Sequence, residues 1–108
     1  LALGGDGLLS PATLEAAIIN RTPGCESHRG LGFHLAGSEG CFLGDLLPSA
    51  AFGHTGFTGT SIAVDPVTGF FCVLLTNRVH PTRANERHLR FRRATHNQLY
   101  AALSRKLG

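Results

Sequence analysis

The sequence predicts an α+β domain in which three antiparallel strands are flanked by an N-terminal and a C-terminal helix. Three observations support this prediction. Apolar residues recur at helical spacing towards both ends of the chain, and apolar runs bounded by glycine or proline lie between them. Hydrophobic residues make up 43% of the 108 residues, which is enough for a core. A chain of this length forms at most one domain.

The first helix is expected at about residues 11–20. Ser10 is a good N-cap, and Pro11 suits the first helical position because no partner is needed there for its missing N–H. Three apolar residues then share one helical face: Leu14, Ala17 and Ile18. The proline and glycine of residues 21–24 are expected to end the helix. Residues 1–9 before it are interpreted as a helix end and a glycine-rich turn, because glycines at 4, 5 and 7 disfavour a helix.

The strands are expected at about residues 30–35, 52–64 and 69–76, with the second strand central and bent at its glycines. Asp65–Gly69 is a strong hairpin signal between two apolar runs. The run Phe70–Leu75 is almost wholly apolar, which is typical of a strand buried on both faces. Such a strand needs material on each side, so a sheet that expects more protein is predicted.

Two polar stretches connect these elements. Residues 36–51 are loop-like, with a helical turn considered around residues 43–47, and residues 77–86 form a second connector. The last helix is expected at about residues 89–107. Its predicted apolar stripe holds five residues: Leu99, Tyr100, Ala102, Leu103 and Leu107. The arginines and Lys106 are expected away from this stripe.

The formal charge is +3, and most of the positive charge lies in one region. The residues concerned are Arg78, Arg83, Arg87, Arg90, Arg92 and Arg93, with His80 and His88. A nucleic-acid site is not expected, because the chain has one lysine and few aromatic residues among these arginines. We interpret the region as a solvated connector and the exposed start of a helix.

Metal and cofactor sites are not expected either. The histidines at 28, 34 and 54 lack ligand spacing, and no Cys-x-x-Cys, His-Glu-x-x-His or phosphate-loop pattern occurs. Of the three cysteines, Cys72 lies in an apolar run and is predicted to be a small core residue, while a disulfide between Cys25 and Cys41 is left open. No signal peptide or apolar run of membrane-spanning length is seen, and the compartment is left open.

Site chemistry is concentrated in residues 53–60, where three glycines alternate with His54 and three threonines. Glycine lets backbone approach backbone, or a ligand, closely. Taken without any family pattern, a lone histidine on a strand is more often structural than functional. This stretch is nevertheless the strongest candidate for a binding or catalytic wall.

His54-Thr55-Gly56 resembles the Lys-Thr-Gly box of serine β-lactamases and penicillin-binding proteins, in the His-Thr-Gly form of class C-like β-lactamases, D,D-peptidases and related esterases. Further segments resemble the same family in the same order: Leu9–Thr13, Gly30–Phe33, Gly53–Ser61, Val64–Pro66 and Val73–Arg78. The resemblance implies the C-terminal part of a β-lactamase/transpeptidase-like α/β sandwich. In that family the sheet is completed by strands from the N-terminus.

The resemblance also implies roles for four residues. His54 stands at the family's lysine position, where a cation or donor steadies the substrate carboxylate and the protonation of its neighbours. Thr55 would offer its hydroxyl to the substrate, Gly56 would keep the cleft open, and the Phe57 N–H would be the second oxyanion-hole donor. Since histidine is mostly neutral at pH 7, the substitution favours an esterase or a broader hydrolase over a penicillin-specific enzyme.

The family's nucleophile motif, Ser-x-x-Lys, and its Tyr-x-Asn element are absent. No serine lies three residues before Lys106, and Tyr100 is followed by two alanines. We therefore expect residues 1–108, which begin at Leu1, to be a single partial domain, the C-terminal fragment of a serine hydrolase, inactive alone. Its expected partners are the missing N-terminal part of the domain and a small ester, amide or β-lactam substrate. The alternative is a non-catalytic interaction module or an inactive scaffold that pairs through its open sheet edge.

Overall fold

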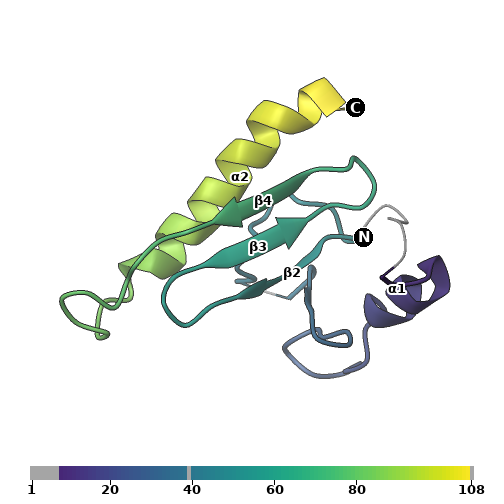
Figure 1. The fold of residues 1–108 in the computed structure, drawn as a ribbon, viewed down its shortest axis with the longest axis horizontal. Helices are drawn as coiled ribbons and strands as arrows, with labels where there is room; N and C mark the ends of the chain where they lie inside the picture. Colours follow the sequence, from purple (N-terminus) through teal and green to yellow (C-terminus); the bar gives the residue numbers. More distant parts are fainter. Residues whose placement is uncertain (1–7, 39, 108) are drawn as a thin grey trace.

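The computed structural model describes residues 8–38 and 40–107, in which two helices flank one antiparallel sheet (Figure 1). The elements in chain order are α1 (Pro11–Ala17), β1 (His34–Leu35), β2 (Phe52–Thr55), β3 (Ser61–Val64), β4 (Phe71–Leu74) and α2 (Arg87–Leu107). The strands are arranged in the order β1-β2-β3-β4. The predicted α+β class, with helices on either side of the antiparallel strands in sequence, is confirmed. The glycine-rich turn expected at residues 4–7 lies outside the described residues.

The prediction of a single strand at residues 52–64 is wrong, because these residues form a hairpin of β2 and β3. His54 pairs with Ile62 in this hairpin. The Gly59 N–H donates to the Gly56 carbonyl at 3.1 Å, which closes the turn between the strands. Gly59 has φ +108°, a conformation that favours glycine. Within the described residues the sheet therefore has four strands instead of three.

The strand predicted at residues 30–35 is shortened to the two residues of β1. The Gly30 N–H donates to the Phe33 carbonyl at 2.9 Å, and Gly32 has φ +79°. The first four residues of the predicted strand thus form a turn, which brings Arg29 opposite His34.

Helix α1 begins as predicted, since the Ser10 side chain accepts a hydrogen bond from the Thr13 N–H at 3.1 Å. It ends at Ala17, earlier than the predicted end near residue 20. The Ala17 carbonyl accepts a hydrogen bond from the Leu31 N–H at 2.8 Å instead of from a further helical turn. The contact with residues 30–31 therefore replaces the helix's own continuation.

The hairpin predicted at Asp65–Gly69 is confirmed and joins β3 to β4. The Asp65 N–H donates to the Phe70 carbonyl at 2.8 Å, and Gly69 has φ +79°. The Asp65 carboxylate accepts hydrogen bonds from the Val67 N–H and the Thr68 hydroxyl. This is the side-chain chemistry by which Asp favours turns.

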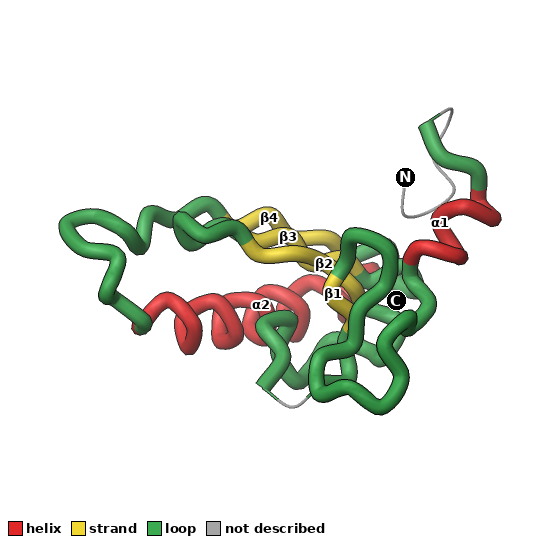
Figure 2. Tube along the Cα trace, turned by 90° about the horizontal axis from the view of Figure 1, so that it is seen from below, coloured by secondary structure: helices red, strands yellow, loops and turns green. Residues whose placement is uncertain are grey.

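Helix α2 lies across one face of the sheet (Figure 2). The core on this side consists of Leu43, Leu47, Ala51, Ala63, Phe70 and Cys72. Cys72 is buried, as predicted. The helical turn considered around residues 43–47 does not form, and two of the three leucines in this segment, Leu43 and Leu47, enter the core. A second, smaller cluster of Leu35, Phe52 and Val64 lies beside Ile18 and Phe33.

The prediction that Phe70–Leu75 is buried on both faces is wrong. Phe70 and Cys72 are buried, but Phe71, Val73 and Leu75 are 69%, 56% and 76% exposed. Within the described residues no element lies over the outer face of β4 (Figure 2). The apolar sequence of the strand thus includes one face that the described part of the chain leaves uncovered.

The predicted apolar stripe of α2 is also wrong, because Leu99 and Leu103 are exposed. The residues that face the sheet are Arg92, at 4% exposure, His96, at 0%, and Tyr100, whose ring lies 5.3 Å from that of Phe70. Spacing of four residues places these three on one face. The burial of Arg92 corrects the interpretation of the arginine region as wholly solvated. The side chain of Leu107 is not described.

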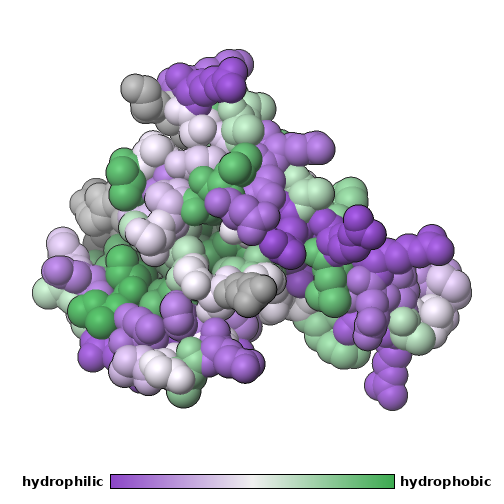
Figure 3. All heavy atoms as spheres, turned by 180° about the vertical axis from the view of Figure 1, so that it is seen from behind, coloured by the Kyte–Doolittle hydropathy of each residue, from purple (hydrophilic) through white to green (hydrophobic). Residues whose placement is uncertain are grey.

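The remaining surface differs from end to end. Seen from behind in Figure 3, hydrophilic side chains dominate over the connector and the start of α2, whereas apolar side chains gather near α1. The exposed apolar residues of that end include Leu8, Leu9, Ile19 and Leu31. The exposed arginines at the end formed by the connector and the start of α2 belong to the region that was predicted to be solvated.

Candidate functional site

The four candidate residues lie together at the end of β2 and in the turn that follows it. Strand β1 pairs with β2 only at Phe52 and Gly53, so it does not cover the next residues of β2. A hollow of about 300 Å³ opens here. It is lined by His54, Thr55, Gly56, Thr60, Ser61, Ile62, Val73 and Leu75. The first three candidates thus line one hollow at the end of β2.

The His54 side chain is exposed, and its Nδ1 lies 2.7 Å from the Thr55 carbonyl oxygen. A carbonyl oxygen can only accept, so Nδ1 carries the proton and donates it. Nε2 is then an acceptor in the neutral ring and a donor in the imidazolium. A lysine ammonium could only donate, whereas the His54 ring has a second nitrogen that can accept.

Thr55 pairs with Ser61 across the hairpin, while His54 pairs with Ile62. Because alternate residues of a strand point to opposite faces, the Thr55 and His54 side chains diverge. A Cβ at Gly56 would lie 2.0 Å from Thr60 Oγ1. The expectation that a side chain at Gly56 would fill the cleft is thus modified, since it would first collide with Thr60 across the turn.

The Phe57 ring is 65% exposed and lies under the Arg78 guanidinium, whose carbon is 4.3 Å from the ring centroid. The Phe57 carbonyl accepts a hydrogen bond from Arg78 Nε at 2.7 Å. Among the described residues, no acceptor pairs with the Phe57 N–H. This backbone N–H is therefore a free donor directly after the His-Thr-Gly segment.

His34 of β1 is a neighbour of the site that the sequence did not single out. Its ring centroid lies 5.0 Å from that of His54, edge to face, and 5.5 Å from that of Phe42. Burial, and then the charges of Arg29 and His54, lower the pKa of His34. No local pattern could have identified the contact, because it depends on the register of β1 against β2.

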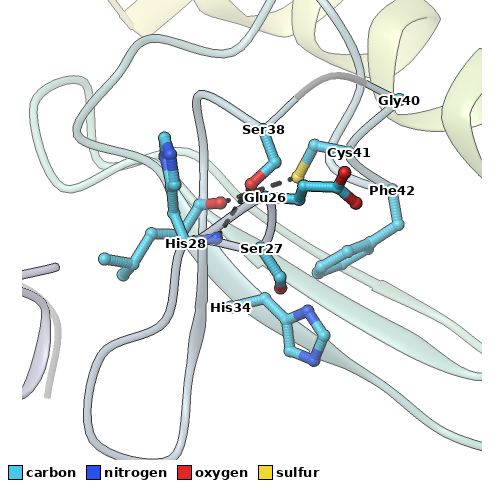
Figure 4. Close-up of a pocket in the computed structure, with 9 residues that line it drawn as sticks. Glu26, Ser27, His28, His34, Ser38, Gly40, Cys41 and Phe42 are labelled. Atoms are coloured by element: carbon cyan, nitrogen blue, oxygen red, sulfur yellow. Dashed lines mark hydrogen bonds between the residues drawn. The ribbon is translucent and has the colours of Figure 1, made fainter. Parts of the chain in front are cut away.

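His34 also lines a second hollow, of about 320 Å³ (Figure 4). The lining is mostly polar and comes from the loops on either side of β1: Glu26, Ser27, His28, Ser38, Gly40, Cys41 and Phe42. The Ser38 hydroxyl accepts a hydrogen bond from the His28 N–H at 3.0 Å, which holds the two loops together. His34 thus stands between this hollow and the one at His54.

A serine and a histidine meet on the other side of the sheet. Ser61 Oγ lies 3.0 Å from His96 Nε2, and His96 Nδ1 donates to the Phe42 carbonyl at 2.9 Å. This resembles a nucleophile, a base and an orienting acceptor. However, Ser61 is only 5% exposed and His96 is 0% exposed, so a substrate has no access to them. Burial lowers the pKa of His96, the bond to Phe42 opposes this, and the charge of Arg92 adds to it.

The weaker candidates stay outside the site. His80 and Arg83 are exposed on the connector, as expected. Within the described residues, no group of three or more potential ligands could hold a metal ion, and no helix is long and apolar enough to cross a membrane. All three cysteines, Cys25, Cys41 and Cys72, are free thiols.

Comparison with known proteins gives one consistent picture. A family model described as Beta-lactamase matches residues 1–97. Proteins named putative D-alanyl-D-alanine carboxypeptidase, from Salmonella gallinarum and Salmonella paratyphi B, are 40% identical over 58 residues, which are 52% of this chain and 13% of theirs. A crystal structure of a beta-lactamase from Mycobacterium bovis has the same fold, with a TM-score of 0.79 at 22% identity. It matches over 94% of this chain and 40% of that one. This chain therefore corresponds to less than half the length of each protein.

Proposed function

The chain belongs to the serine β-lactamase and penicillin-binding-protein-like family, and from this membership we propose that it forms one wall of a serine hydrolase active site. His54, Thr55 and Gly56 line this wall, and the Phe57 N–H is one donor of the oxyanion hole. The observation that supports this most directly is the unpaired Phe57 N–H next to the hollow at the end of β2.

The proposed reaction uses a serine from protein outside these 108 residues, since no Ser-x-x-Lys occurs in them. The serine oxygen attacks the substrate carbonyl, loses its proton to a base and forms a tetrahedral intermediate. The leaving group departs with a proton, and water hydrolyses the acyl-enzyme. The Phe57 N–H would bind the negative oxygen of each tetrahedral intermediate, an interaction of about 3 kcal/mol for one such donor.

The proposed substrate class is an ester, an amide or a β-lactam. The His54 ring presents a nitrogen that can accept where the family's lysine can only donate, which supports substrates that need no strong carboxylate anchor, such as esters. The name of the Salmonella relatives supports a peptide amide instead. Both are carbonyl compounds that one oxyanion hole can serve.

The test measures turnover of nitrocefin and p-nitrophenyl acetate by this chain alone and mixed with a family N-terminal fragment that carries Ser-x-x-Lys. We expect turnover only in the mixture. Phe57→Pro, which removes the N–H, should abolish most of it, whereas Phe57→Ala, which keeps the N–H and removes the ring, should retain more. Turnover by the chain alone would overturn the proposal, because another nucleophile would then be acting.

A second candidate function is a non-catalytic interaction module. It is supported by the uncovered apolar face of β3 and β4, where Ile62, Phe71 and Val73 are at least 39% exposed, and by the position of β4 at the sheet edge. In the same experiment, silence of every mixture together with a well-folded monomer by circular dichroism and sizing would favour this module over the hydrolase.

A further inference from the structure

The turn between β2 and β3 accepts hydrogen bonds from residues that follow β4 and from a residue of α2. Each of its last four carbonyls accepts a hydrogen bond from outside the turn. The pairs are Arg78 Nε to Phe57 O at 2.7 Å, Arg78 N–H to Thr58 O at 2.8 Å, Thr76 Oγ1 to Gly59 O at 2.6 Å, and Arg92 Nη2 to Thr60 O at 3.2 Å. Every one of these carbonyls is therefore fixed by a donor from another segment of the chain.

These contacts decide where the Phe57 N–H points. Inside the turn, the Gly56 carbonyl accepts from the Gly59 N–H at 3.1 Å. In a trans peptide the C=O and the N–H point in opposite directions. Because the Gly56 carbonyl points into the turn, the N–H of the same peptide unit, which belongs to Phe57, points out of it.

Arg78 makes more of these contacts than any other residue. Its guanidinium donates to the Phe57 carbonyl and covers the Phe57 ring, its backbone N–H donates to Thr58, and Nη1 donates to the Arg83 carbonyl at 2.5 Å. A planar guanidinium can stack on a ring and donate sideways at the same time. Lysine would keep the charge but not this geometry.

Arg92 supports the same turn from the sheet side of α2. It is 4% exposed, and its Nε has no hydrogen-bond partner among the described residues. The ion pair recorded in the described structure joins Arg93 to Asp45, so no carboxylate there neutralises Arg92. A buried cation without a carboxylate is costly, and here it faces the Thr60 carbonyl at the end of the turn.

We propose that Arg78 is a positioning residue which, together with Arg92, holds the turn of residues 56–60 so that the Phe57 N–H faces the hollow beside His54. This inference rests on the proposed function, since the N–H matters as an oxyanion donor. Neither arginine lines the hollow.

Amide hydrogen exchange of the 108-residue chain, measured by NMR, tests this directly. Arg78→Gln should accelerate exchange of the Gly59 N–H, which closes the turn, by about tenfold. Arg78→Lys should show a smaller acceleration. Arg90→Gln, a change at an exposed arginine of α2, is the matched control and should show none. Amides of the β3–β4 ladder should keep their exchange rates in all variants.

An unchanged Gly59 exchange rate in Arg78→Gln would overturn the inference. So would a loss of protection shared equally by Gly59 and the β3–β4 ladder, because Arg78 would then only stabilise the fold. In the mixed hydrolase assay, Arg78→Gln should lower kcat about tenfold at unchanged KM, with partial recovery in Arg78→Lys. A raised KM at unchanged kcat would contradict a role in oxyanion binding. If the unmodified mixture shows no turnover, the proposed function fails, and the exchange rates still decide whether Arg78 holds the turn.

Discussion

Two histidines that contact the β2–β3 hairpin, His54 within β2 and His96 on α2, lie in opposite environments. His54 is exposed at the edge of a hollow, and one of its ring nitrogens is unpaired among the described residues. His96 is 0% exposed and uses both ring nitrogens. It belongs to a polar seam between α2 and the sheet, which we define as Ser61, Asp65, Arg92, His96 and Tyr100.

The contrast shows that a serine beside a histidine is no evidence of catalysis by itself. In the polar seam the Ser61 hydroxyl and His96 satisfy each other, because buried polar groups left unpaired are costly. A catalytic or binding group needs access and a free donor or acceptor, which the hollow provides at His54 and Phe57. The polar seam should therefore control stability, and the hollow should control function.

The largest expected effect is on stability and comes from Asp65→Ala. The carboxylate is fully buried and accepts from the Val67 N–H, the Thr68 hydroxyl and the Tyr100 hydroxyl at 2.9, 2.6 and 3.0 Å. Its loss should lower the free energy of unfolding by about 3 kcal/mol, measured by urea denaturation. Asp65→Asn retains one acceptor oxygen and should cost less. If Asp65→Ala lowered the free energy of unfolding by less than a substitution in the hollow does, the division between the polar seam and the hollow would be contradicted.

The second prediction concerns His96→Phe, which leaves the Ser61 hydroxyl and the Phe42 carbonyl without their partner. We expect a loss of about 2 kcal/mol in the free energy of unfolding. Adding Ser61→Ala should restore part of it, because the unpaired hydroxyl is then gone. A double-mutant cycle measures this coupling. Strict additivity of the two changes would show that the 3.0 Å contact contributes nothing.

Sequence reasoning succeeded where local chemistry decides the structure. The Ser10 cap, the Asp65–Gly69 turn and the burial of Cys72 follow from residue types within a few positions. The turn between β2 and β3 was missed although Gly56 and Gly59 signalled it, because the stretch was interpreted as one bent strand. The His-Thr-Gly motif singled out three residues that line the hollow, but not the residues that support it.

The errors concern contacts between distant segments. The face of α2 was assigned from Leu99 and Leu103, whereas the partners of the true inner face, such as Ser61 for His96, lie 35 residues away. Hydrophobicity also predicted that both faces of β4 are covered, whereas no element among the described residues covers one of them. The contact of Arg78 with Phe57, across 21 residues, was equally invisible to local patterns. Tertiary packing, which overrides propensity, decides all three.

The third prediction uses pH to separate the two regions. The pKa of His96 is lowered by burial from its ordinary 6.5, so below that pH the unfolded chain binds more protons than the folded chain. Stability is therefore present at higher pH and is lost as the pH falls below 6.5 towards the folded pKa, by at most about 1.4 kcal/mol per pH unit for one group. His34, whose pKa is lowered mainly by burial, adds an effect of the same sign.

The measurement compares urea denaturation at about pH 8 and about pH 5 for the unmodified chain and for His96→Phe. The unmodified chain should lose more stability on acidification. Asp65 does not interfere in this window. Burial would raise its pKa, but hydrogen bonds from Thr68, Val67 and Tyr100 outweigh that and lower it, so its contribution is lost only below its ordinary 3.8. Equal pH dependence in both proteins would contradict a neutral, buried His96.

The smallest effect on stability is expected from Thr55→Val in the hollow. No hydrogen bond of the Thr55 hydroxyl is recorded among the described residues, so the free energy of unfolding should change by no more than about 0.5 kcal/mol. Thr68→Val makes the same chemical change where the hydroxyl donates to Asp65 at 2.6 Å, and it should cost about 1.5 kcal/mol. If Thr55→Val and Thr68→Val lowered the free energy of unfolding equally, the polar groups of the hollow would also have a structural role. If only Thr68→Val destabilises the chain while only Thr55→Val lowers turnover of the mixture, the hollow is shaped for a ligand and the polar seam for the fold.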